Sequence, residues 1–535
     1  MQTEVVDAVV VGAGHHGLVA AAELADEGWD VLVLERAEVV GGAVASREVD
    51  GWVLDSYSSC HPLGLASPVL RALYLEEHGL EWSHAPAPVT HVGSAQDEAG
   101  SAMLARPEDT AALLEQDHAG DGDTWLRLCE EYARLRDPLW RALLTAWPPV
   151  APLPTLLRRI GVTQLPDFAR FALLPASQMG RELFSGRRAG EILAGNAMHA
   201  DIPPGAPGSG MYGWLMTMLA QDVGFPSPTG GTAPLAEALR RRAEAAGARV
   251  ETGVEVERVL VRGGRATGVE TAGGRRVRAR RAVLADTSAP ALYGRLLDRD
   301  VVPAGLHARL ERRFTWDLPT LKLNYRLTAP LPWRAQRARG AAVVHAGRDL
   351  PGLVDWAADL GAGSVPDAPF ALVGQMATVD PGRAPAGGEA LWLYTHLPRD
   401  ARDAGAVEEA TTASERMLDD LAPGWRDHVI DRWRQSPADL EEADPNLGEG
   451  GVAGGTMQLF QQAIWRPTTG LGGARTPVAG LYLGSAATHP GGGVHGGCGH
   501  IAAQLALRDA RWWGRPLARA GVGATRRLQA EPPRW

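Results

Sequence analysis

The first 35 residues contain the feature that most restricts the fold. An apolar run over 5–11 is followed by the sequence GAGHHG (12–17), an Ala/Leu-rich segment and a second apolar run that ends at Glu35. This order of strand, glycine turn, helix and strand predicts a βαβ unit that binds a dinucleotide. Gly12 would form the tight turn, and Gly14 would let a pyrophosphate approach the helix N-terminus. Gly17 would allow the helix to pack closely on the strand.

The acid at the end of the second run and the glycines after it indicate which dinucleotide is bound. Glu35 is placed to accept a hydrogen bond from a ribose hydroxyl, and Arg36 follows it directly. A second glycine pair, Gly41-Gly42, comes soon afterwards. Such a pair is a feature of FAD proteins that resemble glutathione reductase and the amine oxidases. We therefore expect non-covalent FAD, and no stably bound nicotinamide, because only one dinucleotide fingerprint is present.

Composition narrows the class of protein. The chain has 535 residues, more than one ordinary core needs, so two or more domains are expected. Its net charge of −10 argues against a nucleic-acid partner, which would require a basic face. The three cysteines form no C-x-x-C pair, so we predict neither a disulfide framework nor a metal site. Without a recognisable signal peptide, we expect a cytoplasmic enzyme.

Two segments could attach the protein to a membrane surface. Residues 152–175 mix apolar side chains with three arginines, and the tail from Arg508 has seven arginines against two acids, with Trp512 and Trp513 alongside. Such patterns suit an anionic lipid surface. The alternative is an amphipathic segment that packs on its own domain and a solvated tail. Peripheral contact with the inner face of the membrane is thus one of two open interpretations.

The order of the segments predicts interleaved domains. We expect a discontinuous FAD-binding domain from residues 1–90, 225–300 and 450–510. A helical and mixed-sheet substrate domain would use residues 91–224 and 301–449, and residues 511–535 would form a basic C-terminal tail. The expected fold class is α/β (α+β), in which a Rossmann domain is interleaved with the substrate domain.

Several motifs together resemble one family. They are the N-terminal glycine motif, PSPTGG (226–231), ARVETGVEVERV (248–259) and LYLGSAATHPGGGVHGGCG (481–499). The combination resembles the phytoene desaturase and carotenoid isomerase group of flavoproteins. It is most similar to the bacterial relatives of pyridine nucleotide-disulphide oxidoreductase domain-containing protein two. This resemblance covers nearly the whole chain and implies a glutathione-reductase-like FAD domain with a mixed-sheet substrate domain.

The resemblance also assigns further positions to the cofactor. In such proteins the C-terminal glycine loop passes under the flavin, where a helix N-terminus stabilises the negative charge of the reduced ring. It implies that Gly492, Gly493 and Val494 contact the ring and that Gly484 and Ser485 lie at the diphosphate or ribityl chain. It also implies that Gly231 shapes the chain near the flavin and that Val254 contacts the adenine.

Two side chains are candidates for catalysis. Lys322 is the only lysine among 53 lysines and arginines. Flavin amine oxidases have a lysine in a comparable strand, where it holds a water near flavin N5, and the alternative here is a chance surface lysine. His61, which precedes a proline turn, is a weaker candidate, because for it and for His489 and His495 a structural role is more common.

The resemblance implies a hydrophobic, isoprenoid or carotenoid-like substrate that gives a hydride to the flavin, in a desaturation or a redox-neutral isomerisation. The apolar segment 209–220 could line a tunnel for it. Electrons would leave to oxygen or a quinone. A flavin amine or amino-acid oxidase is the alternative enzyme, and an FAD-binding protein with a non-catalytic partner-binding role is the alternative of another class. The oligomeric state stays open.

Overall fold

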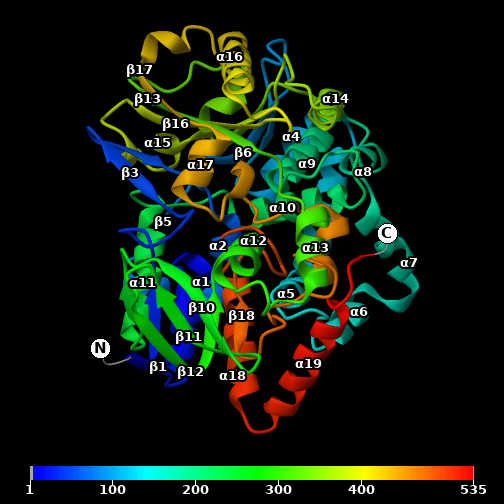
Figure 1. The fold of residues 1–535 in the computed structure, drawn as a ribbon. Helices are drawn as coiled ribbons and strands as arrows, with labels where there is room; N and C mark the ends of the chain where they lie inside the picture. Colours follow the sequence, from blue (N-terminus) through cyan, green and yellow to red (C-terminus); the bar gives the residue numbers. More distant parts are fainter. Residues whose placement is uncertain (1–3, 534–535) are drawn as a thin grey trace.

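The computed structural model describes residues 4–533, which form two seven-stranded sheets, one above the other in Figure 1. The first sheet has the order β10-β11-β12-β1-β2-β9, with β18 also paired to β12. Its strands are β1 (Glu4–Val11), β2 (Val31–Leu34), β9 (Arg249–Glu251), β10 (Val256–Arg262), β11 (Arg265–Thr271), β12 (Arg276–Ala285) and β18 (Leu481–Leu483).

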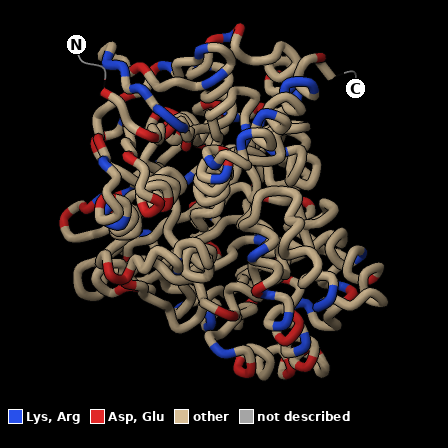
Figure 2. The backbone as a smooth tube through the Cα atoms, turned by 90° about the horizontal axis from the view of Figure 1, so that it is seen from below, with Lys and Arg blue, Asp and Glu red and all other residues tan. Residues whose placement is uncertain are grey.

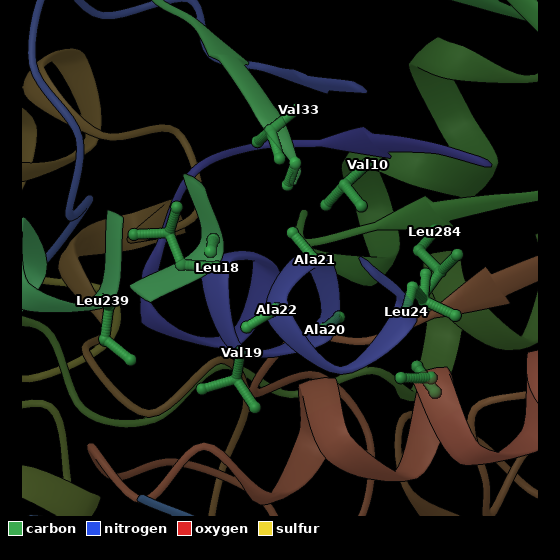
Figure 3. Packing of buried hydrophobic residues seen from close by; sticks show 14 of the residues in the cluster. Val10, Leu18, Val19, Ala20, Ala21, Ala22, Leu24, Val33, Leu239 and Leu284 are labelled. Atoms are coloured by element: carbon green, nitrogen blue, oxygen red, sulfur yellow. The ribbon is translucent and has the colours of Figure 1, made fainter. Parts of the chain in front are cut away.

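The expected βαβ unit is present at the centre of this sheet. β1 pairs in parallel with both β2 and β12, and β18 pairs in parallel with the other side of β12. Helix α1 (His15–Asp26) joins β1 to β2 and lies between α11 (Ala233–Ala245) and α18 (Gly497–Ala510). Figure 3 shows the apolar side chains of α1, among them Leu18 and Leu24, packed against strand residues such as Val10 and Val33. This packing fixes the position of the glycine turn that precedes α1.

The second sheet has the order β17-β13-β16-β15-β14-β6-β7 and is antiparallel except between β14 and β6. Its strands are β6 (Ala87–Val92), β7 (Ser101–Met103), β13 (Thr320–Leu327), β14 (Ala341–Ala346), β15 (Ala371–Gln375), β16 (Glu389–His396) and β17 (Val429–Gln435). Two short ribbons, β3–β4 (Ser46–Val49 and Trp52–Asp55) and β5–β8 (Trp82–Ser83 and Ser227–Pro228), stand apart from both sheets.

Register in the second sheet gives β13 and β16 two different faces. Lys322 lies opposite Tyr394, and Thr320 lies opposite His396. Alternate residues of the same strands, such as Leu321 and Leu393, belong to an apolar core cluster. Because side chains alternate along a strand, one face packs in the core and the other carries the polar side chains described below.

Helices cover the second sheet and one side of the molecule (Figure 1). The longer ones are α4 (Pro107–Asp117), α5 (Asp121–Leu143), α6 (Leu153–Ile160), α7 (Leu165–Leu173), α8 (Ala176–Leu183), α9 (Arg187–Ala197), α10 (Ser209–Val223), α13 (Ala304–Arg313), α14 (Leu350–Gly361), α16 (Ala404–Leu421), α17 (Pro437–Ala443) and α19 (Gly514–Leu528). Short helices include α2 (Pro62–Ala66), α3 (Pro68–Arg71), α12 (Ala289–Ala291), α15 (Met376–Val379) and the 3-10 turn η3 (Met198–Ala200). Within residues 4–533, no helix combines the length and the apolar character that crossing a bilayer requires.

Both sheets draw on separated parts of the chain, as interleaved domains require. The expected boundary at residue 90 falls inside β6, which belongs to the second sheet, so this strand starts before the boundary we predicted. The expected basic tail contains helix α19, and the side chain of Gln529 just after it is fully buried. Figure 2 shows positive and negative segments spread around the periphery of the chain, with few of either in its centre.

Candidate active site

The turn between β1 and α1 has positions that accept only glycine. Gly12 has φ = +97°, a conformation that L side chains rarely adopt. A Cβ at Gly14 would lie 2.5 Å from Asp286 Oδ2, and a Cβ at Gly17 would lie 2.3 Å from the Gly12 carbonyl oxygen. The Gly17 N–H donates to Asp286 Oδ2 over 2.8 Å. An acid that follows β12 is therefore part of this turn, a contact that the N-terminal motif alone does not predict.

Asp286 is a buried acid at the N-terminus of α1. Burial raises the pKa of Asp286 to about 8, although its hydrogen bond from Gly17 acts in the opposite direction. The carboxyl group is therefore mostly neutral at pH 7 and adds little negative charge where a diphosphate would bind. The sequence signal for it is VLAD (283–286), an acid directly after an apolar strand.

Glu35 ends β2 and is largely buried. Its two carboxylate oxygens accept from the Ala13 N–H (2.7 Å) and the Ala37 N–H (2.8 Å). Each oxygen keeps a further lone pair, so the carboxylate can both brace the glycine turn and accept from a ribose hydroxyl. Arg36 is exposed and donates to the Ala443 carbonyl oxygen. The Val254 N–H donates to the Glu35 carbonyl oxygen, which holds Val254 beside the predicted ribose acid.

Gly41 connects the second glycine pair to the first turn. Its N–H donates to the Ala13 carbonyl oxygen over 2.9 Å, and Gly41 and Gly14 form an isolated parallel bridge. A Cβ on Gly42 would lie 3.7 Å from the Gly14 Cα. The structure thus brings Gly14, Gly41 and Gly42 together as one backbone-lined surface.

The C-terminal glycine loop lies on the other side of this surface. Gly492, Gly493 and Val494 line the same cavity as Gly14, and the Gly493 carbonyl oxygen lies 3.3 Å from His15 Nε2. Ser485 also lines the cavity, and its hydroxyl donates to the Thr287 carbonyl oxygen over 2.6 Å. Residues almost 480 positions apart therefore meet at one end of one cavity.

Two other glycines that we assigned to the cofactor are away from the lining of this cavity. The Gly484 N–H donates to the Ala285 carbonyl oxygen, and a Cβ there would lie 3.0 Å from Ala502 Cβ on α18. Gly231 has φ = +104°, and a Cβ there would lie 2.7 Å from the Ser46 hydroxyl oxygen. Strand pairing and close packing explain both glycines without a ligand.

The cavity has a volume of about 610 Å³ and joins the glycine surfaces to an apolar interior. Helix α10 supplies much of the apolar wall, as expected for segment 209–220. Further apolar lining comes from α5, β14, β15 and β16. The α10 residues in the lining are Met211, Tyr212, Leu215, Met216 and Leu219, and the others include Leu139, Leu143, Phe225, Val343, Leu372 and Trp392.

Lys322 lies on β13 in the wall of this cavity and is 3% exposed, so the alternative of a chance surface lysine is wrong. Its Nζ donates to the carbonyl oxygens of Asp55 (2.8 Å) and Tyr57 (2.6 Å). Burial lowers the pKa of Lys322 to about 7, although the nearby Asp55 carboxylate acts to raise it. An amine with such a pKa can hold or release a proton near neutral pH.

The histidines at the cavity are uncharged at neutral pH. Burial lowers the pKa of His61 to about 4, that of His15 to about 4 and that of His495 to about 3. His61 lines the cavity but its Nε2 has no hydrogen-bond partner among the described residues. The geometry therefore gives His61 a place at the cavity but no second group that would activate it.

A polar cluster in the β16 wall was not foreseen from the sequence. Asp201, which follows η3, lies 2.6 Å from His396 Nε2, and the Tyr394 hydroxyl donates to both Asp201 carboxylate oxygens at 3.3 Å. Asp201 and His396 are 4% and 3% exposed. Because they are 195 residues apart, no spacing in the sequence indicates that they are partners.

His16, His495 and Cys498 also come together, with one potential ligand atom each within 4.8 Å of the others. Both nitrogens of His495 already have partners, because Nδ1 accepts from the Gly497 N–H and Nε2 lies 3.2 Å from the Gly491 carbonyl oxygen. These bonds favour a structural role for His495 in the glycine loop.

The residues at the glycine end of the cavity fit a flavin dinucleotide. Glycines from both ends of the chain line this region, so a flat ring can approach their backbone closely. The N-terminus of α1 faces it, and the neutral Asp286 does not repel a diphosphate. Gly14, Gly41, Gly42, Gly492, Gly493 and Val494 would hold the cofactor, which when bound would supply a hydride acceptor.

Comparisons with known proteins agree with this geometry. Residues 10–76 match the model of the NAD(P)-binding Rossmann-like domain. The chain is 28% identical to rat pyridine nucleotide-disulfide oxidoreductase domain-containing protein 2, with 94% of this chain and 93% of the relative covered. It is 26% identical to the zeta-carotene-forming phytoene desaturase of Myxococcus xanthus, with 91% and 90% covered.

The fold is also that of a solved structure of putrescine oxidase bound to putrescine. The TM-score is 0.59 at 17% identity, with 95% of this chain and 99% of the other covered. Together with the sequence relatives, the Rossmann match indicates FAD as the cofactor. The chain is therefore an FAD-dependent oxidoreductase, homologous to the phytoene and carotenoid desaturases and to pyridine nucleotide-disulfide oxidoreductase domain-containing protein 2.

Proposed function

We propose that this oxidoreductase acts on a long hydrophobic molecule of the isoprenoid or carotenoid class, by desaturation or redox-neutral isomerisation. One observation carries the proposal: the cavity that begins at the glycine surfaces continues along the apolar face of α10. A polyene would lie on Met211, Leu215 and Leu219 with a reacting carbon at the glycine end. The phytoene desaturase among the relatives supports the same class of substrate.

Residues of the chain would position such a substrate in several ways. The apolar wall would exclude water and bind the hydrocarbon by burial, at about 25 cal/mol for each Å² removed from water. Lys322, held by two backbone carbonyls, would present an amine at the polar end. The bound FAD would accept the hydride, and we infer oxygen or a quinone as the final electron acceptor of a desaturation.

Oxidation of an amine is a second candidate, which the polar β16 wall favours. Trp392 and Tyr394 present aromatic rings beside Lys322, and the Asp201 carboxylate could bind an ammonium group. The putrescine oxidase fold is compatible with either substrate.

The experiment that separates these candidates is anaerobic reduction of the bound flavin. Purified protein is mixed without oxygen with phytoene in detergent, and separately with putrescine, while flavin absorbance is recorded. Bleaching by phytoene alone supports desaturation. Bleaching by putrescine alone would overturn the polyene proposal. Conversion of a cis-polyene without net bleaching, detected by chromatography, would indicate isomerisation.

We also propose that the protein collects its substrate from an anionic membrane surface. Exposed apolar side chains lie close together on α7, on α19 and on residues 459–465. The Leu173 carbonyl oxygen accepts from the Gly208 N–H, the Cβ position of Gly208 is 2.8 Å from Leu459, and that of Gly470 is 3.3 Å from Leu528. We call this set the apolar surface: Leu173, Leu459, Phe460, Ile464, Trp465 and Leu528, all more than one third exposed.

Helices α6 and α19 lie on the same side of the molecule as α7 (Figure 1). The last turn of α19 contains Arg526 and Arg527, next to Leu528. The last turn of α6 contains Arg158 and Arg159. Helix α10 has side chains that line the cavity, and Gly208, the N-cap residue before it, lies against Leu459. An apolar route from the lipid to the cavity would thus be short.

Sedimentation with vesicles tests this proposal. We expect binding to phosphatidylglycerol vesicles and weaker binding to phosphatidylcholine vesicles, because the arginines need anionic headgroups. The double variant Phe460→Ser/Trp465→Ser should lose most of the binding. Ile430→Ser, at an exposed apolar position on β17, is the control. If the double variant binds the vesicles as well as the wild type does, the apolar surface has no role in membrane binding.

A further inference from the structure

The cavity wall contains an acid–base cluster that the proposed function has not used. Asp201 and Tyr394 line the cavity, whereas His396 supports the carboxylate from outside the lining. Asp201 Oδ1 accepts from His396 Nε2 over 2.6 Å, and Oδ2 has only a 3.3 Å contact with the Tyr394 hydroxyl among the described residues. The carboxylate therefore has one strongly held oxygen and one oxygen with free accepting capacity.

Both ring nitrogens of His396 face oxygen atoms. Its Nε2 faces the Asp201 carboxylate, and its Nδ1 lies 3.4 Å from the Pro319 carbonyl oxygen. Neither oxygen can donate a proton, so both ring nitrogens meet acceptors, as the doubly protonated ring requires. Burial alone would lower the pKa of His396, but the Asp201 carboxylate outweighs burial and raises it. His396 Nε2 therefore holds the Asp201 carboxylate at one oxygen and fixes its orientation.

The backbone of Asp201 also departs from the ordinary conformation. Asp201 has φ = +53°, in the left-handed region, although it is not a glycine. Residues held in this region cluster at functional sites, where the surrounding structure fixes them. Here the conformation turns the carboxylate toward β16 and the cavity.

Strand register places this cluster beside Lys322. Tyr394 is the direct partner of Lys322, and His396 is the partner of Thr320, two residues along the same strand. Two residues of a strand span about 7 Å, so the carboxylate held by His396 and the buried amine lie along the same part of the cavity wall. The other charged groups that act on the cluster are Asp317, before β13, and Arg399, after β16.

We propose that Asp201 is the base that removes a proton from the substrate carbon next to the one that gives up the hydride. This inference rests on the proposed desaturation. The C–H bond of the first carbon breaks with its electron pair, which leaves as hydride to the oxidant FAD. The C–H bond of the adjacent carbon also breaks, its electron pair forms the new C=C bond, and the proton goes to Asp201 Oδ2. His396 is a positioning residue that orients the carboxylate through its Nε2.

The variant Asp201→Asn tests the base, because asparagine keeps the size and the oxygen that faces His396 and tolerates the same backbone conformation. With phytoene as the probe in anaerobic stopped flow, we expect flavin reduction to slow by about 100-fold or more. Deuterium at the proton-losing carbon should give a larger isotope effect in the variant. FAD content and the flavin spectrum should match those of the wild type.

Glu389→Gln is the matched control, because Glu389 is a buried acid on the same strand that does not line the cavity. It should reduce flavin at the wild-type rate. His396→Gln should slow reduction less than Asp201→Asn does. Imidazole NMR of the resting protein gives a readout without turnover: the pKa of His396 should be above 6.5 in the wild type and fall in Asp201→Asn.

The outcomes separate this inference from the proposed function. Wild-type rates in Asp201→Asn, or an unchanged pKa of His396, would overturn the base and leave the desaturation in place. Loss of FAD or of the cooperative fold in Asp201→Asn would assign Asp201 a structural role and would also overturn it. A wild-type flavin that phytoene does not bleach would overturn both the desaturation and the base, and would leave isomerisation to the test with a cis-polyene.

Discussion

Arg383 Nη2 lies 2.7 Å from Asp55 Oδ2, and neither side chain is reached by solvent. The pair lies under the cavity wall, because the backbone carbonyl of Asp55 also holds Lys322 Nζ. Burial would raise the pKa of Asp55, but the Arg383 guanidinium and Lys322 outweigh it and lower that pKa. Asp55 thus connects β4 to the segment before β16 through its carboxylate, and to the candidate catalytic amine through its backbone carbonyl.

Breaking this pair should destabilise the protein strongly. Arg383→Met leaves the Asp55 charge buried without its main partner, and we expect a loss of about 3–5 kcal/mol in the free energy of unfolding. Urea denaturation followed by fluorescence measures it. The exposed pair of Arg426 and Asp419 provides the comparison, since Arg426→Met should cost about 1 kcal/mol or less. Equal losses of unfolding free energy in the two variants would contradict the prediction that the buried Asp55 carboxylate depends on Arg383.

Lys322 gives a prediction for the rates of flavin reduction and reoxidation. Lys322→Met removes the amine from the cavity, so we expect slower flavin reduction or reoxidation at unchanged FAD content. Lys322→Arg should also impair the reaction, because the larger guanidinium cannot occupy the same place between two carbonyls. Stopped-flow traces of both variants that overlay the wild type in both half-reactions would remove Lys322 from the chemistry.

The pH dependence of stability tests the burial of the same amine. The pKa of Lys322 falls from 10.5 to about 7 on folding, so the unfolded chain binds the proton more tightly. The wild type should therefore gain stability as pH rises from about 7 to 10.5, by at most about 5 kcal/mol. Lys322→Met should lack this gain. Parallel stability curves for the two proteins across this range would contradict it.

Asp286 should show the opposite trend. Its pKa rises from 3.8 to about 8 on folding, so the unfolded chain loses the proton first as pH rises. The protein without cofactor should lose stability between about pH 4 and 8, and Asp286→Asn should be more stable than the wild type at pH 8 by about 2 kcal/mol or more. Thermal melts at pH 5 and pH 8 measure the difference, which should be smaller at pH 5 and should nearly vanish only near about pH 4.

Glu35 should contribute to cofactor retention. Glu35→Gln keeps one accepting oxygen for the backbone but loses the carboxylate, and we expect FAD affinity to fall by about 1–3 kcal/mol. Flavin fluorescence during dialysis reports the released fraction. Arg36→Gln, which changes the exposed neighbour, shows whether any loss is specific to the acid. Wild-type retention in Glu35→Gln would exclude the ribose contact.

The sequence predicts the glycine turns well because their constraints are local. Gly12, Gly14 and Gly17 each have a fixed task within a few residues of a strand and a helix, and the structure has the expected βαβ unit there. The lone lysine could be singled out by counting, but only the register of β13 and β16 places it opposite Tyr394. Asp201 and His396 could not be paired, because their contact depends on how η3 meets β16. Gly484 and Gly231 show the converse, since close packing explains glycines that the motif alone assigns to a ligand.

The two-faced register of β13 and β16 determines how this protein can acquire new substrates. Every second side chain can be exchanged to alter what the cavity accepts, while the residues between them continue to hold the core. Insertion of a single residue in either strand would exchange the two sets and expose Leu393 or Leu321 in place of Tyr394 or Lys322. Variation in this wall should therefore proceed by substitution at alternate positions, and length changes should be confined to the loops that join the strands.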